Sequence, residues 1–142
     1  MTIDQTQDEI IEEFNDIDDW MDRYAYIIDM GNQLDPMPDN LKTPENLIEG
    51  CQSRAWLAAT LDDNGLIHYQ ADSDALIVKG IISLLLKVLS GHTPDQIIDS
   101  QLYFIDRIGL AENLSPTRSN GLLALLKQMK LYAVAYKAKS AE

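Results

Sequence analysis

The chain has 142 residues, of which 46% are hydrophobic and 24% charged, the size and composition of one compact domain with a sizeable core. Its formal net charge of −12 argues against binding to nucleic acid or to anionic membrane surfaces, because both depend on clustered Lys and Arg. No apolar run approaches the ~20 residues that span a bilayer. The N-terminus is acidic where a secretory signal would be basic, so we expect a cytoplasmic protein.

Helical periodicity dominates the first third of the chain. Thr6-Gln7-Asp8-Glu9 fits a capping box, and apolar residues follow at three- and four-residue steps. This pattern predicts one helix, or two helices broken near Asn15-Asp16, with Gly31 as the C-terminal cap. Residues 34–46 contain three prolines and are expected to form a loop or an extended crossing.

The middle of the chain predicts a small antiparallel sheet. Residues 47–49, 54–61 and 66–70 are the expected strands, and Asn64-Gly65 is typical of the tight turn that joins the last two.

Helices are predicted to follow the sheet. The first covers residues 75–89, is capped by Ser73 or Asp74 and ends at Gly91. Others begin at Thr93-Pro94 and at Ser115-Pro116, the last running to about Lys137. Gly80 inside a helix costs about 1 kcal/mol relative to Ala, so we expect close packing there against another backbone, such as that of the sheet. The elements predict an α+β fold, with a three-stranded antiparallel sheet packed with helices, in a single domain over residues 1–142.

Charge is unevenly distributed along the chain. Nine carboxylates and no base lie between Asp4 and Asp22, whereas five bases and no acid lie between Arg118 and Lys139. Two interpretations remain open: solvated helix faces, or surfaces that steer a partner of opposite charge.

Cys51 is the only cysteine, which excludes an internal disulfide and a multi-cysteine metal site within this chain. It follows Gly50 in a predicted turn, and it is either a small buried apolar residue or a reactive thiol on a loop. A free thiol has a pKa of about 8.5 and needs a nearby cation to form much thiolate at neutral pH. The candidate cations are Arg54, Arg23, Arg118 and His68.

The remaining polar motifs favour structural roles. His68 is predicted to be a half-exposed strand residue and His92 the polar end of a helix, and neither fits a cysteine-hydrolase pattern. Asp72-Ser73-Asp74 fits helix capping better than a cation loop, because further oxygen ligands are missing. We therefore expect no metal site and no cofactor of the protein's own.

Four segments together resemble the SufE family of iron–sulfur cluster assembly. They are WMDRYAYIIDMG at 20–31, GCQSRAW at 50–56, ADSDALIVKGIISLLL at 71–86 and LSPTRSNGLLALL at 114–126. The resemblance implies the α+β fold shared with IscU-like scaffolds. The family usually has Gln-Val where this chain has Arg54-Ala55, which puts an additional cation three residues from the thiol.

The resemblance also implies a function. Cys51 would accept persulfide sulfur from a pyridoxal-phosphate-dependent cysteine desulfurase of the SufS type, stimulate that enzyme, and deliver the sulfur to a SufB-containing scaffold. The chain would be a sulfur-transfer accessory protein more than an independent enzyme, and either a monomer or a homodimer. Its expected partner-binding residues are Arg118, Gln52, Ser53, Arg54 and Asp74.

Two other functions remain open from sequence. The chain could be a regulatory binding module of a desulfurase of the related Csd type, with no sulfur transfer through Cys51. An independent cysteine-dependent hydrolase or peroxidase is disfavoured, because no partner histidine or resolving cysteine is evident. If Cys51 is a carrier, we expect its sulfur to be shielded by apolar side chains until a partner docks.

Overall fold

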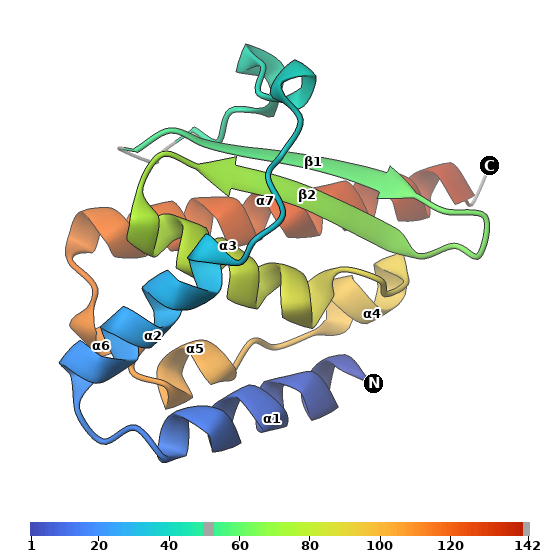
Figure 1. Ribbon diagram of the computed structural model, residues 1–142. Helices are drawn as coiled ribbons and strands as arrows, with labels where there is room; N and C mark the ends of the chain where they lie inside the picture. The colour runs from blue at the N-terminus through green and yellow to red at the C-terminus, as the bar shows by residue number, and fades with distance from the viewer. Residues whose placement is uncertain (50–52, 141–142) are drawn as a thin grey trace.

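The computed structural model describes residues 1–49 and 53–140. These residues form two strands and seven α-helices, and two short 3-10 helices lie between the second α-helix and the first strand (Figure 1). In chain order the elements are α1 (Ile3–Asn15), α2 (Trp20–Asn32), η1 (Asp39–Leu41), η2 (Pro44–Asn46), β1 (Ala55–Leu61), β2 (Ile67–Ser73), α3 (Leu76–Leu89), α4 (Pro94–Asp99), α5 (Phe104–Arg107), α6 (Leu110–Asn113) and α7 (Pro116–Ser140).

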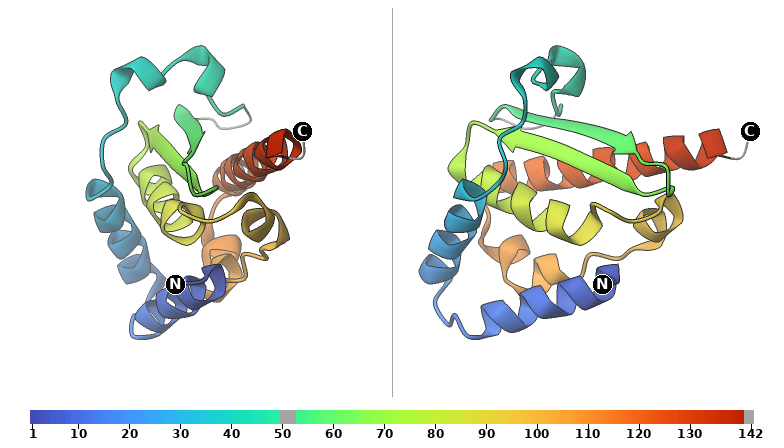
Figure 2. Two further views of the ribbon diagram at one scale, coloured as in Figure 1. Left: turned by 90° about the vertical axis from the view of Figure 1, so that its right-hand side faces the viewer. Right: turned by 45° about the vertical axis from the view of Figure 1, so that its right-hand side comes forward.

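The elements form layers below the sheet in the view of Figure 1. Helices α3 and α7 pack against the two strands, and α2 crosses α3. Helices α1, α4, α5 and α6 lie on the side of α3 and α7 that faces away from the sheet (Figures 1 and 2). The segment with η1 and η2 rises from the end of α2, past the strands, to a position above β1. This segment therefore carries the chain back to the start of β1.

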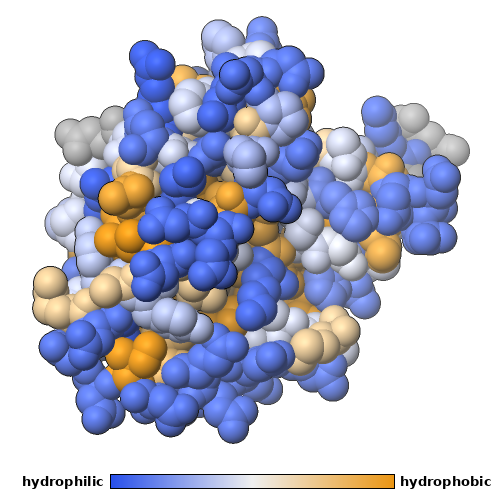
Figure 3. Space-filling model, in the orientation of Figure 1, coloured by the Kyte–Doolittle hydropathy of each residue, from blue (hydrophilic) through white to orange (hydrophobic). Residues whose placement is uncertain are grey.

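Helix α3 is the centre of the core. Nine of its residues are buried, as expected from its nearly continuous apolar sequence. The buried apolar side chains form one cluster that extends from Ile3 to Ala133. Gln7 is completely buried in this cluster, and its amide pairs with the backbone at Gln101 and Phe104. On the face seen in Figure 3, hydrophilic side chains dominate and apolar ones form small separate patches.

Helices α2 and α3 cross at two glycines. A Cβ on Gly80 would overlap the carbonyl of Ile27, and one on Gly31 would meet the backbone at Gly80. Gly80 thus packs closely against another backbone, as predicted, but that backbone belongs to α2 and not to the sheet. The prediction of Gly31 as a C-terminal cap is wrong, because α2 ends at Asn32 and Gln33 is its cap.

The N-terminal helices confirm the predicted break and correct the predicted start. The chain leaves α1 at Asn15 and enters α2 at Trp20. Helix α1 begins at Ile3, earlier than the expected start, because Thr2 and Gln5 form the capping box instead. Thr6 lies inside the helix, where its hydroxyl donates to the carbonyl of Thr2.

The small antiparallel sheet is confirmed, with two strands among the described residues where three were expected. The predicted turn joins them, and Gly65 adopts a φ of 81°, which favours glycine. The expected strand at 47–49 is reduced to a single bridge between Leu47 and Trp56. The 3-10 helix η2 runs to Asn46, so only Leu47, Ile48 and Glu49 are available for pairing in this part of the described chain.

Helix α7 protects the free edge of β1. The hydroxyl of Tyr136 donates to the carbonyl of Ala59 at 2.9 Å, and that of Tyr132 lies 3.5 Å from the carbonyl of Leu57. These contacts satisfy strand carbonyls that would otherwise be open to another chain. Among the helices of the described ranges, none has both the length and the apolar character that crossing a bilayer requires.

Candidate functional site

Cys51 and Gln52, together with Gly50, lie outside the described residues, so the candidate site is described here by its two flanks. The C-terminal flank is a set of contacts that we call the clamp, formed by residues 53–54 and 73–75. The N-terminal flank is residues 42–49, which we call the strap. Ile48 of the strap donates its amide to the carbonyl of Ala55 at 2.8 Å. The strap and the start of β1 therefore lie together, and the segment that contains Cys51 connects them.

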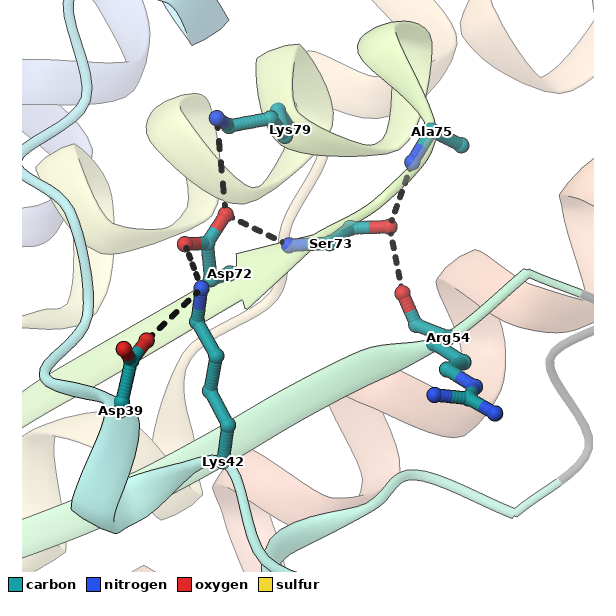
Figure 4. A network of polar contacts seen from close by, with 7 residues as sticks. All are labelled: Asp39, Lys42, Arg54, Asp72, Ser73, Ala75 and Lys79. Atoms are coloured by element: carbon teal, nitrogen blue, oxygen red, sulfur yellow. Dashed lines mark hydrogen bonds and ion pairs between the residues drawn. The ribbon is translucent and has the colours of Figure 1, made fainter.

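The clamp bonds both backbone groups of Arg54, its amide and its carbonyl. The Arg54 amide donates to the Asp74 carboxylate at 3.1 Å, and the Arg54 carbonyl accepts from the Asp74 amide at 3.1 Å. The Ser73 hydroxyl donates to the same carbonyl at 2.7 Å and accepts from the amide of Ala75 at 3.2 Å. Figure 4 shows Ser73 between Arg54 and the start of α3. The clamp thus extends the β1–β2 pairing by one residue beyond the strands.

Arg118 joins the clamp from the start of α7. Its guanidinium donates to the Ser53 hydroxyl at 3.0 Å, across 65 positions of sequence. Its own amide contacts the Ser115 hydroxyl at 3.3 Å. The structure therefore brings together Ser53, Arg54, Asp74 and Arg118, the four described members of the predicted partner-binding set.

The other candidate cations lie elsewhere. His68 pairs with Thr60 in the strand register, whereas Ser73 pairs with Ala55, so the histidine is five residues from the clamp along β2. At about 3.3 Å per residue, that separation is roughly 17 Å. His68 instead contacts Asp62 at 2.7 Å in the hairpin.

The side chain of Arg23 is also bonded to groups outside the clamp. Its side chain donates to the carbonyls of Ile17 and Ile108, at 2.7 and 3.0 Å, where it ties the α1–α2 connection to the end of α5. Of the candidate cations, Arg54 and Arg118 are therefore the two that belong to the clamp.

A groove borders the strap. Its volume is about 720 Å³, and it lies between residues 44–49, Leu57 of β1 and one face of α7. Leu47 and Leu131 contribute apolar side chains that are 41% and 48% exposed, and Lys127 lies at the same face of α7. A groove of mixed apolar and polar lining is thus present beside the chain that leads to Cys51. The expected shielding of the thiol itself concerns a residue outside the described part of the chain and stays a prediction.

Asp72 is the residue whose role the sequence did not reveal. Its side chain is 6% exposed and lies 3.3 Å from the ammonium group of Lys42 and 3.6 Å from that of Lys79. From sequence, Asp72 was interpreted as part of a helix-capping motif. Lys42 lies in a proline-rich segment where no motif or spacing marked it as a functional residue.

The predicted capping of α3 by Ser73 or Asp74 is wrong: the helix begins at Leu76, its N-cap is Ala75, and no described side chain caps it. The Ser73 hydroxyl accepts the amide of Ala75 instead, before the first turn of the helix. Among residues 1–49 and 53–140, no group of three or more His, Cys, Asp or Glu side chains could hold a metal ion.

The architecture defines the general class of the protein. It is an α+β domain in which a helix-backed antiparallel hairpin carries the candidate site at one end. The model is similar to the solution structure of a hypothetical protein from Thermus thermophilus, with a TM-score of 0.76 and 20% sequence identity. The similarity covers 94% of this chain and 96% of that chain. At this identity the match supports the fold alone.

The family is established by a second comparison. The model of the SufE family, described as an Fe-S metabolism associated domain, matches residues 8–133. The chain therefore belongs to the SufE family, as its four sequence segments predicted, and its domain is one associated with iron–sulfur metabolism. The matched range includes both flanks of the candidate site and the segment between them.

Proposed function

We propose that this protein accepts sulfur from a cysteine desulfurase of the SufS type, carries it as a persulfide on Cys51, and delivers it to a SufB-containing scaffold. The observation that carries the proposal is the family match over residues 8–133, with the single cysteine of the chain inside that range. The arrangement of strap and clamp around the segment with Cys51 supports it.

The proposed reaction is a thiol–persulfide exchange. The thiolate of Cys51 attacks the terminal sulfur of a desulfurase cysteine persulfide, the S–S bond within that persulfide breaks, and the desulfurase cysteine leaves as a thiolate. A new S–S bond forms on Cys51, and its terminal sulfur is then available to an acceptor thiolate on the scaffold. One thiol is sufficient for such a carrier because each partner provides the other sulfur. Pyridoxal phosphate belongs to the desulfurase, and no cofactor is proposed for this chain.

The clamp offers groups suited to this exchange. The Arg118 guanidinium bonds Ser53, which directly follows the segment, and Arg54 adds a second positive side chain three residues from Cys51 in the sequence. Cations near a thiol favour the nucleophilic thiolate. Arg54 and Asp74 are exposed, and Arg118 and Ser53 are partly exposed, so all four are accessible to a docking protein. We propose that they contact the desulfurase together with Gln52.

The test is persulfide mapping. The protein is incubated with a SufS-type desulfurase and cysteine, and its peptides are analysed by mass spectrometry under non-reducing conditions. We expect one or more additional sulfur atoms on the peptide with Cys51. The Cys51→Ser variant should fold normally and should no longer accelerate sulfide release. Wild-type protein alkylated at its single thiol is the matched control, because it blocks the same atom without a substitution.

The outcomes separate the two open functions. Absence of persulfide on Cys51 would contradict the carrier proposal. Full stimulation of the desulfurase by Cys51→Ser or by the alkylated protein would support the alternative, a regulatory binding module that acts without sulfur transfer through this residue.

A further inference from the structure

The strap is attached to the sheet by a buried carboxylate that the proposed exchange does not use. Asp72 lies on β2, directly opposite Trp56 of β1. Its side chain is 6% exposed and accepts the amide of Ser73 at 2.8 Å. Figure 4 shows lysines from two separate segments reaching it: Lys42 from the strap and Lys79 from α3.

Lys42 contacts both strands. Its ammonium group is 3.3 Å from Asp72 on β2, and it lies 5.6 Å from the centre of the Trp56 ring on β1, within the range of a cation–π interaction. Its side chain is 29% exposed, less than that of a typical surface lysine. A contact at 3.9 Å with the fully exposed Asp39 contributes little by comparison.

The strap has a second attachment closer to Cys51. Leu47 forms a bridge with Trp56, and the amide of Ile48 bonds the carbonyl of Ala55. Lys42 and Leu47 therefore both reach Trp56, one through its side chain and one through its backbone. Between these points, Asn46 donates to the carbonyl of Leu41 at 2.8 Å and keeps the intervening turn compact.

The burial of Asp72 makes its partners important. A buried carboxylate is costly unless it is paired and hydrogen-bonded, and removal of one partner leaves its charge poorly compensated. Burial acts to raise the pKa of Asp72, but the Ser73 amide and the two lysines outweigh this and lower it. The ionised form is thus favoured in the folded protein, and it supports both lysine contacts.

We propose that Lys42 is a positioning residue: through Asp72 and Trp56 it fixes the strap on the sheet and sets how the chain enters the segment that contains Cys51. Lys79 binds the same carboxylate but anchors only α3, so it does not share this role. The consequence for sulfur transfer rests on the proposed function, whereas the anchoring of the strap does not.

The structural test compares two matched variants by hydrogen exchange. Lys42→Met and Lys79→Met each remove one positive partner of Asp72, but only the first releases the strap. We expect exchange of the Ile48 amide to accelerate about tenfold in Lys42→Met and less than about twofold in Lys79→Met. Lys42→Arg should restore protection, because a guanidinium can reach the carboxylate and stack on the indole.

Two measurements keep this test specific. Exchange at the amides of the β1–β2 ladder reports any general loss of stability. It should change to a similar extent in the two Met variants, which each remove one partner of Asp72, and little in Lys42→Arg. Equal acceleration of the Ile48 amide in both Met variants would overturn the proposal, as would unchanged exchange in Lys42→Met. If Lys42→Met is poorly folded, Lys42→Gln provides the same comparison with a polar side chain.

The functional arm uses stimulation of a SufS-type desulfurase. We expect Lys42→Met to raise the protein concentration for half-maximal stimulation about fivefold while the maximal rate changes less than about twofold, since Cys51 is intact and only its presentation is altered. Lys79→Met should match the wild type in both quantities. If Cys51 never carries sulfur but Ile48 exchange responds as expected, the proposed function fails and the anchoring role stands; the reverse result overturns the role of Lys42 alone.

Discussion

The clamp and the strap lead to the same three residues but are held in different ways. In the clamp, Arg54 is bonded to Ser73 and Asp74 as a continuation of the strand pairing, and Ser53 is bonded to Arg118. The strap has one backbone bond to β1, at Ile48, whose side chain is buried in the core, and Lys42 adds a side-chain attachment to Asp72. One flank therefore continues the strand pairing, whereas the other is held by a short bridge, one buried side chain and an ion pair.

The largest expected effect comes from the crossing of α2 with α3, the helix that directly follows the clamp residues 73–75. Gly80→Ala places a methyl group against the carbonyl of Ile27, so α2 and α3 must separate. We expect a loss of about 2 kcal/mol in the free energy of unfolding, because backbone overlap outweighs the helix-propensity gain of Ala. Urea denaturation measures this change. Ser83→Ala in the same helix is the control and should stay within about 0.5 kcal/mol; equal stability of the two variants would contradict the close crossing.

A smaller effect is expected within the clamp itself. Ser73→Ala removes the hydroxyl that joins the Arg54 carbonyl to the Ala75 amide, and should cost about 1–2 kcal/mol. Hydrogen exchange should also accelerate at Ala75. Ser90→Ala is the matched control, because Ser90 accepts the amide of Tyr69 at a different point of β2. If both variants loosen the clamp equally, the clamp is not a local unit.

Arg118 should matter more for docking than for stability. Arg118→Ala loses a partly exposed bond to Ser53, so we expect the free energy of unfolding to fall by less than about 1 kcal/mol. The concentration for half-maximal desulfurase stimulation should rise about fivefold, equivalent to ~1 kcal/mol. Lys139→Ala, at an exposed base near the other end of the same helix, is the control for net charge. An identical effect of the two substitutions would show that Arg118 acts only through charge.

The smallest effect is a change in how stability depends on pH. It concerns Asp72, which pairs with Lys42 of the strap and accepts the amide of Ser73 in the clamp. The pKa of Asp72 is lowered in the folded state, so its ionised form adds stability that is complete above the ordinary value of about 3.9 and is lost as pH falls through the lower folded-state value. Asp72→Asn should therefore show a shallower decline in stability below about pH 4 than the wild type. Asp39→Asn, at an exposed carboxylate, should retain the wild-type slope. Thermal unfolding across roughly pH 2.5–6 gives both slopes, within the range where Asp titrates.

Much of the fold was predictable because its signals are local. The helix start at Thr93-Pro94, the turn at Gly65 and the apolar sequence of α3 each specify structure within a few residues, and the structure confirms them. The start of α1 was predicted wrongly because two overlapping capping patterns occur there, and local sequence does not decide between Thr2 and Thr6. The third strand was overestimated because pairing depends on the path of the strap, which sequence periodicity does not reveal.

The candidate site was predictable only in part. The expected partner-binding residues followed from the family resemblance, and the structure brings the four described ones together. Lys42 and Asp72 were missed because their importance lies in a contact between segments far apart in the sequence. A buried ion pair between such distant residues has no periodic or spacing signature.

The α+β class, the family and the presence of a single thiol can be read from the chain alone, because periodicity, capping and a collinear set of motifs are properties of its sequence. Which arginine reaches Ser53, which backbone meets Gly80 and how the strap is attached depend on the folded arrangement. Those features depend on distances between remote segments, and such distances exist only once α2, α3, α7 and the sheet have packed around one core.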